Sequence, residues 1–436
     1  MNYNETLEYL YSSIPSFQDV GIGAYKPGLE RITQFCKILG NPQRNYFVIH
    51  IAGTNGKGSV SHLLASILQQ AGYQTGLFTS PHLLDFRERI RVQGEIISKQ
   101  KVVNFIDRHK NEIEELGMSY FEMVTAMAFD YFAQSDVEVA VIETGLGGRL
   151  DATNIVIPSL SIITNIGLEH TELLGDTLPK IAQEKGGIIK KCIPVILGEK
   201  DSSYNLVLEE IAKDKQSEIT YATDVFECID QYYEDDKQVF SLIRKDDGVH
   251  YLLRSSLMGE YQRQNILTAA TAIHILHYKT PLSITRRAFI DGVRDVVETT
   301  SFNGRWQRLG SSPEIICDTG HNSHGLKFVA QQLQKYIDNQ KKVHCIMGFC
   351  SDKDISQILN LMPKKASYLF TQANVQRAKN MEEIKQEALA IGLNADTAEN
   401  IPAAIEQTLQ KASKEDLIFI GGSNFIVGET LNYFQK

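Results

Sequence analysis

The chain has 436 residues, of which 43% are hydrophobic and 22% charged, and its formal net charge at pH 7 is -9. Because this length is about three times that of a common single domain and the composition is near the soluble globular average, we expect two domains and exclude disordered, collagen-like and fibrous proteins. A negative net charge has the wrong sign for a chain whose main partner is a polyphosphate backbone, so we expect no nucleic-acid partner.

Apolar runs bounded by glycine and polar clusters alternate with segments of helical period in the first part of the chain. Strands are predicted at 47–52, 137–143 and 160–166, and helices at 57–72 and 177–190. This alternation is typical of βαβ units, so it predicts a mostly parallel sheet.

Residues 218–255 interrupt this pattern with short alternating stretches that are separated by charged turns. Such stretches predict a small antiparallel insert. Two helices are predicted after it, at 261–277 and 283–291.

A polar, glycine-containing segment then predicts a domain boundary near residue 298, between residues 1–297 and 298–436. The second domain is predicted to contain a helix from about residue 323 and strands at 314–318, 343–349, 368–371 and 417–422. The expected fold is α/β: a P-loop-type domain with a mostly parallel sheet and a small antiparallel insert, and a smaller Rossmann-like C-terminal domain.

The six cysteines lie far apart and include no C-x-x-C pair, so we expect neither a zinc site nor a disulfide framework. The N-terminal segment has neither a basic start nor an apolar core, and no run of about 18 apolar residues occurs. We therefore expect a cytoplasmic protein with no membrane partner, and we expect it to be a monomer.

A glycine-rich loop follows the first predicted strand and consists of Gly53, Thr54, Asn55, Gly56, Lys57, Gly58 and Ser59. Glycines let backbone N–H groups approach phosphate oxygens, a helix N-terminus favours anions, the lysine adds charge, and a hydroxyl can reach Mg²⁺. The generic G-x-x-x-x-G-K-[ST] motif does not fit, because it would need Gly at Ile51 and Ser or Thr at Gly58. We interpret the loop as a phosphate site; the alternative is a tight turn between a strand and a helix.

The compact form GTNGKGS resembles the phosphate loop of the Mur ligase superfamily, and in particular of its folate branch, the dihydrofolate synthases and folylpolyglutamate synthases. Further segments follow in the family's order: TSPHL, FRERIRV, YFEMVTAMAF, ETGLGGRLDATN, EHTELLGDT, EKGGII, GEYQRQN, NGRWQ and DTGHN. Together with the loop they extend from residue 53 to residue 322, and the segments after residue 322 are less diagnostic.

The resemblance implies an ATP-dependent ligase that uses two Mg²⁺ ions and adds L-glutamate to dihydropteroate and to folates through an acyl phosphate. The RLDATN segment favours activity on both acceptors. Three alternatives stay open: a ligase that only extends polyglutamate tails, a Mur-type ligase with a peptidoglycan-precursor acceptor, and a GTP-binding switch. The absence of the guanine-reading N-K-x-D motif argues against the switch.

Glu143 ends a predicted parallel strand, so it should lie at the sheet edge where ligands collect, and its hard oxygen suits Mg²⁺. His170 also follows a strand and matches a metal-binding histidine of the family. Ser59 and Ser80 carry hydroxyls at the family's metal positions. The structural alternatives are turn, cap and hydrogen-bonding roles.

Lys185 lies on a predicted helix beside two glycines and looks from its neighbours like a solvated surface residue. The resemblance implies instead that CO₂ carbamylates it, which would make it an anionic ligand of the second Mg²⁺. Such chemistry needs a lowered pKa, as burial would give. The catalytic residues implied by the resemblance are Lys57, Glu143, His170 and Lys185.

The resemblance also implies residues that contact the nucleotide. Arg305 resembles the arginine that reaches the ATP phosphates when the domains close, and Asp318 is implied at the ribose or the phosphates. The chain departs from the family at Tyr261, where many members have His, and at Thr319-Gly320, which replaces Gly-Ala. The residues implied at the nucleotide, besides the phosphate loop, are Gln262, Asn265, Arg305, Asp318 and His321; for Gln262 the alternative is an ordinary start of an amphipathic helix.

Residues 24–31, 119–122 and 149–154 suggest a groove for the pterin ring. Phe121 could stack on the ring, and Asp151 could accept hydrogen bonds from its amino and N–H groups. Core packing is the alternative for Phe121. The predicted substrate-binding residues are Ser119, Phe121, Asp151 and Ala152.

Overall fold

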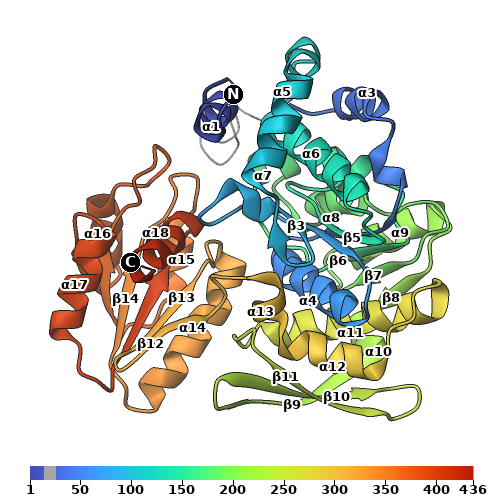
Figure 1. The fold of residues 1–436 in the computed structure, drawn as a ribbon. Coiled ribbons are helices and arrows are strands. Elements are labelled where there is room, and N and C mark those ends of the chain that lie inside the picture. Colours follow the sequence, from blue (N-terminus) through green and yellow to red (C-terminus); the bar gives the residue numbers. More distant parts are fainter. Residues whose placement is uncertain (14–25, 436) are drawn as a thin grey trace. The chain divides into compact units, whose positions relative to one another are not determined.

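The computed structural model describes residues 1–13 and 26–435 (Figure 1). They form two compact units. Unit 1 consists of Met1–His82, Phe86–Ser256 and Gln262–Phe302. Unit 2 consists of Leu83–Asp85, Leu257–Tyr261 and Asn303–Lys436. Among the described residues, no helix is both long and apolar enough to cross a membrane.

Unit 1 is built on an eight-stranded sheet with the order β4-β3-β2-β5-β1-β6-β7-β8. The strands β2, β5, β1, β6, β7 and β8 pair in parallel, and β3 and β4 add an antiparallel edge. The bounds are β1 (Phe47–Ala52), β2 (Thr75–Phe78), β3 (Ile90–Val92), β4 (Glu95–Ile96), β5 (Val139–Glu143), β6 (Leu160–Ile163), β7 (Val195–Leu197) and β8 (Ile219–Tyr221). The predicted mostly parallel sheet is confirmed.

Helices of unit 1 bury the apolar faces of this sheet. One core packs sheet residues such as Val48 and Ile142 against α3, α5 and α6, and α4 packs against α11 and α12. The bounds are α1 (Tyr3–Ser13), α3 (Glu30–Ile38), α4 (Lys57–Gln70), α5 (Lys99–Glu115), α6 (Tyr120–Gln134), α7 (Thr171–Leu174), α8 (Leu178–Gly186), α9 (Asn205–Asp214), α10 (Ala222–Val225), α11 (Gln262–Lys279), α12 (Arg286–Arg294) and α13 (Val296–Thr300). Short 3-10 helices occur at η2 (Pro42–Arg44), η3 (Phe86–Arg89) and η4 (Ala152–Ile155).

A three-stranded antiparallel sheet, with the order β11-β10-β9, interrupts unit 1. Its strands are β9 (Phe226–Glu234), β10 (Lys237–Arg244) and β11 (His250–Ser255). The predicted insert is thus confirmed, but its predicted start at residue 218 is wrong. β8 pairs in parallel with β7 and belongs to the large sheet, because an alternating pattern shows that a segment is a strand without showing its partner.

Unit 2 contains a six-stranded sheet with the order β12-β13-β17-β14-β15-β16, in which only β12 is antiparallel to its neighbour. The strands are β12 (Gln307–Ser311), β13 (Glu314–Asp318), β14 (Val343–Met347), β15 (Ser367–Phe370), β16 (Asn394–Thr397) and β17 (Leu417–Gly421). The helices are α14 (Ser323–Asp338), α15 (Ile355–Leu361), α16 (Met381–Ala390), α17 (Ile401–Lys411) and α18 (Asn424–Phe434).

Alternate residues of the unit 2 strands enter different cores. Ile316 and Phe419 pack with residues of α14, α15 and α16, whereas Ile315 and Ile418 pack with residues of α17 and α18. Because successive side chains of a strand point to opposite faces, helices cover both faces of this sheet. The predicted smaller α/β domain is confirmed.

Candidate functional site

The glycine-rich loop lies between β1 and α4 and depends on two glycines. Gly53 has φ +154° and Gly56 has φ +83°. A Cβ at Gly53 would lie 1.8 Å from Thr164 Oγ1, and a Cβ at Gly56 would lie 2.3 Å from Asn265 Oδ1. Both positions therefore require glycine, because a side chain would meet a neighbour and the backbone of Gly56 is left-handed.

The residues that follow β6 hold the loop. The backbone N–H of Asn55 donates to Asn165 Oδ1 at 2.8 Å, and Thr164 Oγ1 donates to the carbonyl of Asn55 at 2.6 Å. The backbone N–H of Thr54 donates to the carbonyl of Asn165 at 3.0 Å. Sequence reasoning missed this role of Thr164 and Asn165, although two polar residues directly after a buried strand were a usable signal.

These bonds determine which amides can face an anion. The N–H groups of Thr54 and Asn55 already have acceptors in the protein. Intrahelical bonding in α4 begins with the N–H of Val60 donating to the carbonyl of Gly56 at 2.9 Å. The amides of the first turn precede that bond and point out of the helix end, where the helix dipole favours negative charge.

Two lysines donate to the same carbonyl of the loop. Lys57 Nζ lies 3.0 Å from the carbonyl oxygen of Gly53 and 3.2 Å from that of Thr54, and Lys185 Nζ lies 2.7 Å from the Gly53 oxygen. The side chain of Lys185, on α8, is only 4% exposed. Burial, together with the positive charge of Lys57, lowers the pKa of Lys185 to about 7.

The glycines of the EKGGII segment explain why this lysine is buried. A Cβ at Gly187 would lie 2.3 Å from Arg149 Cα, and a Cβ at Gly148 would lie 2.8 Å from the carbonyl oxygen of Lys185. The end of α8 therefore packs directly against the backbone of residues 148–149. Close backbone packing leaves little room for water around Lys185.

The beginning of α11 lies beside the loop. Gln262 Nε2 donates to Ser59 Oγ at 3.4 Å, and Asn265 Nδ2 donates to Gln262 Oε1 at 2.7 Å. Ser59 is 2% exposed. Within unit 1, the structure therefore places Gln262 and Asn265 beside the phosphate loop, where Gln262 contacts Ser59.

Glu143 ends β5 and is 3% exposed, and its Oε2 accepts a hydrogen bond from the backbone N–H of Ser80 at 3.2 Å. His170 is half-buried and precedes α7 with φ +51°. Among residues 1–13 and 26–435, no cluster of three or more His, Cys, Asp and Glu side chains could hold a metal by itself. One buried carboxylate still fits Mg²⁺, which commonly binds one or two carboxylates together with phosphates and water.

The predicted substrate residues lie at the start of α6 and in the 145–155 segment. Ser119 caps α6, where its Oγ accepts from the N–H of Glu122 at 3.3 Å. Phe121 is half-buried; its ring lies 5.8 Å from that of Phe78, and a Cβ at Gly145 would lie 2.4 Å from its Cζ. Ala24 and Tyr25 of the predicted groove lie outside the described residues.

Asp151 is buried and belongs to a polar chain. Its Oδ2 accepts from the N–H of Leu146 at 2.8 Å, and its Oδ1 accepts from Thr153 Oγ1 at 2.5 Å and from the N–H of Thr153 at 3.0 Å. His50 Nε2 lies 2.8 Å from Thr153 Oγ1. Burial raises the pKa of Asp151. In this structure Asp151 therefore caps η4, which begins with Ala152.

Unit 2 contains its own group of predicted residues. Asp318, at the end of β13, is 2% exposed, and its Oδ2 accepts from the N–H of Trp306 at 2.8 Å. Arg305 Nη1 donates to Thr319 Oγ1, and His321 Nδ1 lies 2.9 Å from the carbonyl oxygen of Thr319. These contacts bring Arg305, Asp318 and His321 together around one loop.

The exchanged order Thr319-Gly320 does not strain this loop. Neither residue has a positive φ, so the backbone has no need of glycine at a particular one of the two positions. Instead the N–H of Gly320 donates to Asp318 Oδ1 at 2.7 Å.

Comparison with protein families matches both parts of the chain. A model of the Mur ligase middle domain matches residues 51–273, and a model described as "Mur ligase, glutamate ligase domain" matches residues 304–424. A Buchnera aphidicola (subsp. Schizaphis graminum) relative named "Dihydrofolate synthase/folylpolyglutamate synthase" is 31% identical over 412 residues, which cover 93% of each chain. A Haloferax volcanii relative, "Probable bifunctional folylpolyglutamate synthase/dihydropteroate synthase", is 29% identical; this chain spans about half of its length.

Solved structures of folate-branch enzymes are similar in fold to this chain over its whole length. Folylpolyglutamate synthase from Thermotoga maritima is 31% identical, with a TM-score of 0.81, over 100% of this chain and 97% of that chain. E. coli FolC in complex with DHPP and ADP is 27% identical, with a TM-score of 0.84, over 100% and 98%. A bifunctional folylpolyglutamate synthase/dihydrofolate synthase with Mn, AMPPNP and L-glutamate bound is 26% identical, with a TM-score of 0.84, over the same shares. This chain belongs to the Mur ligase superfamily, in its folate branch of dihydrofolate and folylpolyglutamate synthases, and is an ATP-dependent ligase.

Proposed function

We propose that this ligase adds L-glutamate both to dihydropteroate, giving dihydrofolate, and to folates that already carry glutamate. The observation that carries the proposal is the GTNGKGS loop, held at the N-terminus of α4, in a chain that matches relatives of this name over nearly its whole length. A relative has been solved with DHPP and ADP, and another with Mn, AMPPNP and L-glutamate, which supports nucleotide, divalent metal and glutamate as ligands.

The proposed reaction has two steps. A carboxylate oxygen of the acceptor bonds to the γ-phosphorus of ATP while the bond to ADP breaks, which gives an acyl phosphate. The amino nitrogen of glutamate then bonds to the acyl carbon, phosphate leaves, and the nitrogen loses a proton. Negative charge gathers on the phosphoryl group in both steps, so a fixed cation and helix amides at the loop would stabilise it.

The residues of unit 1 are suited to these tasks. Lys57 donates to two carbonyls of its own loop and can turn its ammonium toward a phosphate. Bound Mg²⁺ would neutralise phosphate charge, and the residues proposed to hold it are Ser59, Ser80, Glu143, His170 and, at a second site, Lys185. We further propose residues 1–297 as the ATP-binding domain and 298–436 as the glutamate-ligase domain, with Arg305, Asp318 and His321 contributing to the nucleotide.

Lys185 is proposed to be carbamylated. The unprotonated nitrogen bonds to the carbon of CO₂ and loses a proton, which replaces an ammonium by a carboxylate-like oxygen ligand. With a pKa of about 7, the amine is largely unprotonated at pH 8, whereas an ordinary lysine is not. The hypothesis accounts for a lysine that is buried and that forms no ion pair with a carboxylate among the described residues.

A spectroscopic experiment tests this modification. Protein equilibrated with ¹³C-bicarbonate should show a carbamate resonance that Lys185→Arg abolishes. Lys190→Arg is the matched control, because burial also lowers the pKa of Lys190 to about 8 while its Nζ donates to the Asn154 carbonyl at 2.8 Å. Loss of the resonance in the Lys190 variant, or its persistence in the Lys185 variant, would refute the assignment.

The function itself is tested by incubating purified protein with ATP, glutamate and dihydropteroate while phosphate release and product mass are followed. Phosphate should appear only with both co-substrates, and the product should gain one glutamate. Lys57→Ala should lose about 100-fold or more in rate, whereas the exposed Lys180→Ala should not. Turnover of folates alone would leave a polyglutamylation enzyme, and turnover only of a peptidoglycan precursor would indicate a Mur-type acceptor.

A further inference from the structure

Tyr261 stands beside the buried carboxylate of Asp318 in unit 2. Its hydroxyl donates to Asp318 Oδ2 at 2.5 Å, the same oxygen that accepts from the N–H of Trp306 at 2.8 Å. The other oxygen, Oδ1, accepts from the N–H of Gly320 at 2.7 Å. A hydrogen bond from a hydroxyl to a carboxylate is stronger than one between two neutral groups, so it restrains the rotation of the Asp318 carboxylate.

The position of Tyr261 is itself fixed. A Cβ at Gly259, where φ is +113°, would lie 2.9 Å from the tyrosine ring, so the ring packs directly over the backbone of this glycine. The N–H of Glu260 donates to Gln332 Oε1 at 3.1 Å, and Lys335 Nζ donates to Glu260 Oε1 at 2.5 Å. Both partners lie on α14, so the segment Leu257–Tyr261 is attached to unit 2.

The contacts leave a defined acceptor on Asp318. A carboxylate can accept about four hydrogen bonds, two at each oxygen. Within the described part of the chain, Oδ2 accepts two and Oδ1 accepts one. One acceptor direction, on Oδ1, therefore remains for a ligand. An anionic phosphate would be repelled by it, whereas a neutral hydroxyl can donate to it.

We propose that Tyr261 is a positioning residue for the nucleotide: it holds Asp318 so that the one open acceptor of Oδ1 receives a hydroxyl of the ribose. This inference rests on the proposed function, because it takes ATP as the ligand of Asp318. The inference assigns a role to Tyr261, which stands where many members of the family have histidine.

The test is ADP binding to the full-length protein, measured by calorimetry together with 2′-deoxy-ADP and 3′-deoxy-ADP. The unaltered protein should bind one of the deoxy analogues about tenfold more weakly than ADP, since a hydrogen bond to a carboxylate contributes about that much. Tyr261→Phe should weaken ADP binding several-fold and should reduce the discrimination against that analogue. Tyr261→His, which keeps an N–H donor, should restore part of both.

The matched control is Tyr368→Phe, which removes another buried hydroxyl of unit 2, one that donates to the carbonyl of Pro363 at 2.6 Å. It should leave both the ADP affinity and the discrimination unchanged, while thermal unfolding shows whether either variant is merely less stable. Unchanged discrimination in Tyr261→Phe, or none in the unaltered protein, would overturn the proposal. Failure of glutamate ligation in the turnover assay is a separate outcome, because these measurements need no acceptor.

Discussion

The phosphate loop shows how a missing side chain can determine a ligand site. Gly56 and Gly72 both have left-handed backbones, with φ +83° and +91°. A Cβ at Gly56 would lie 2.3 Å from Asn265 Oδ1, whereas nothing lies within 4 Å of a Cβ at Gly72. The two positions therefore separate the cost of backbone strain from the cost of the contact with Asn265.

We predict that Gly56→Ala and Gly72→Ala each lose about 1 kcal/mol of stability, because alanine resists a positive φ. Only Gly56→Ala should also weaken ADP binding, by tenfold or more, since its methyl displaces the Asn265 side chain beside the loop. Calorimetric titration with ADP and thermal unfolding measure the two effects. Equal ADP affinity in the two variants would mean that the position of Asn265 does not matter to the nucleotide.

His50 provides a prediction on pH. Burial, together with the positive charge of Lys190, lowers the pKa of His50 to about 3. On unfolding, the pKa returns to about 6.5, so below that pH the unfolded state binds a proton that the folded state does not. The stability contributed by neutral His50 is therefore complete above about pH 6.5 and falls as the pH decreases toward 3.

We predict that His50→Gln reduces the dependence of the unfolding free energy on pH between about 4 and 6.5 by up to one proton. Asp151, which is linked to His50 through Thr153 and whose pKa is raised by burial, stays in both proteins, so it does not contribute to the difference between them. Urea unfolding followed by far-UV circular dichroism measures this slope. Fluorescence of Trp306, the single tryptophan, reports unit 2 and should show no change; equal slopes in both proteins would contradict the prediction.

Lys185 illustrates what the sequence could and could not predict at this scale. A lysine near the end of a helix gives no sign of burial by itself, and only the family resemblance assigned it a role. The physical signal lay in its neighbours, because glycines at 187 and 148 allow two backbones to meet around it. The hydrogen bond from the backbone N–H of Asn55 to Asn165 was missed because it joins segments that lie 110 residues apart in the sequence.

At the scale of elements, apolar runs predicted β1, β5, β6, β13, β14, β15 and β17, but the short strands β2 and β7, which are buried inside the large sheet, were not predicted. β1 and β13 have the predicted bounds, and five of the six residues of β1 are buried. The edge strands β12 and β16 were not predicted, because both have exposed and half-buried residues and lack an apolar run. Their formation depends on a neighbouring strand rather than on their own pattern.

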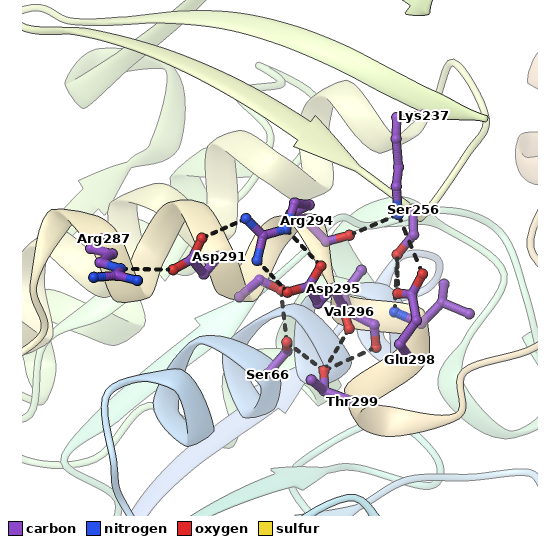
Figure 2. Close-up of polar contacts among 12 residues, drawn as sticks. Ser66, Lys237, Ser256, Arg287, Asp291, Arg294, Asp295, Val296, Glu298 and Thr299 are labelled. Carbon is purple, nitrogen blue, oxygen red and sulfur yellow. Dashed lines mark hydrogen bonds and ion pairs between the residues drawn. The ribbon is translucent and has the colours of Figure 1, made fainter. Parts of the chain in front are cut away.

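The packing of α4 against α12 and α13 combines a close crossing with hydrogen bonds between helices (Figure 2). Ser66 Oγ donates to the carbonyl of Gly292 at 2.7 Å and lies 2.6 Å from Thr299 Oγ1. A Cβ at Gly292 would lie 2.5 Å from Ile67 Cα. By contrast, Arg287 forms an ion pair with Asp291 at 3.4 Å while its side chain is 92% exposed.

We predict that Ser66→Ala costs about 1 kcal/mol of stability, because the carbonyl of Gly292 loses the hydroxyl that donates to it, whereas the Thr299 hydroxyl keeps the carbonyl of Asp295 at 2.8 Å. Arg287→Ala, in the same network, should cost less than about 0.5 kcal/mol, since an exposed pair is screened by water. Urea unfolding of the two variants provides the comparison. A loss in Arg287→Ala as large as that in Ser66→Ala would show that the exposed ion pairs stabilise this helix contact.

At the scale of the whole molecule, unit 2 is assembled from three separate stretches of chain. Besides residues from Asn303 onward, it includes Leu83–Asp85 and Leu257–Tyr261, each flanked by residues of unit 1. A sequence reading that divides the chain once, near residue 298, could not show this, because the two short stretches carry no pattern of their own. They belong to unit 2 by their contacts: Leu83 and Met258 each pack against one of its cores.

The attachment of Leu83 depends on a helical glycine. A Cβ at Gly428, on α18, would lie 2.6 Å from the backbone carbonyl oxygen of Leu83, and backbone cannot turn aside as a flexible side chain can. In an open helix, a change from glycine to alanine stabilises by about 1 kcal/mol. We predict that Gly428→Ala instead destabilises the protein and speeds amide exchange in a peptide that covers residues 83–85, because the added methyl displaces that stretch.

Hydrogen exchange followed by mass spectrometry measures the protection, and thermal unfolding gives the sign of the stability change. Gly392→Ala is the control within unit 2: with φ +81° and nothing within 4 Å of its Cβ, it introduces strain without a contact. It should lower stability by about 1 kcal/mol and leave the exchange at residues 83–85 unchanged. If Gly428→Ala raises the melting temperature and leaves that exchange unchanged, α18 does not hold the Leu83 stretch, and its place in unit 2 must come from other contacts.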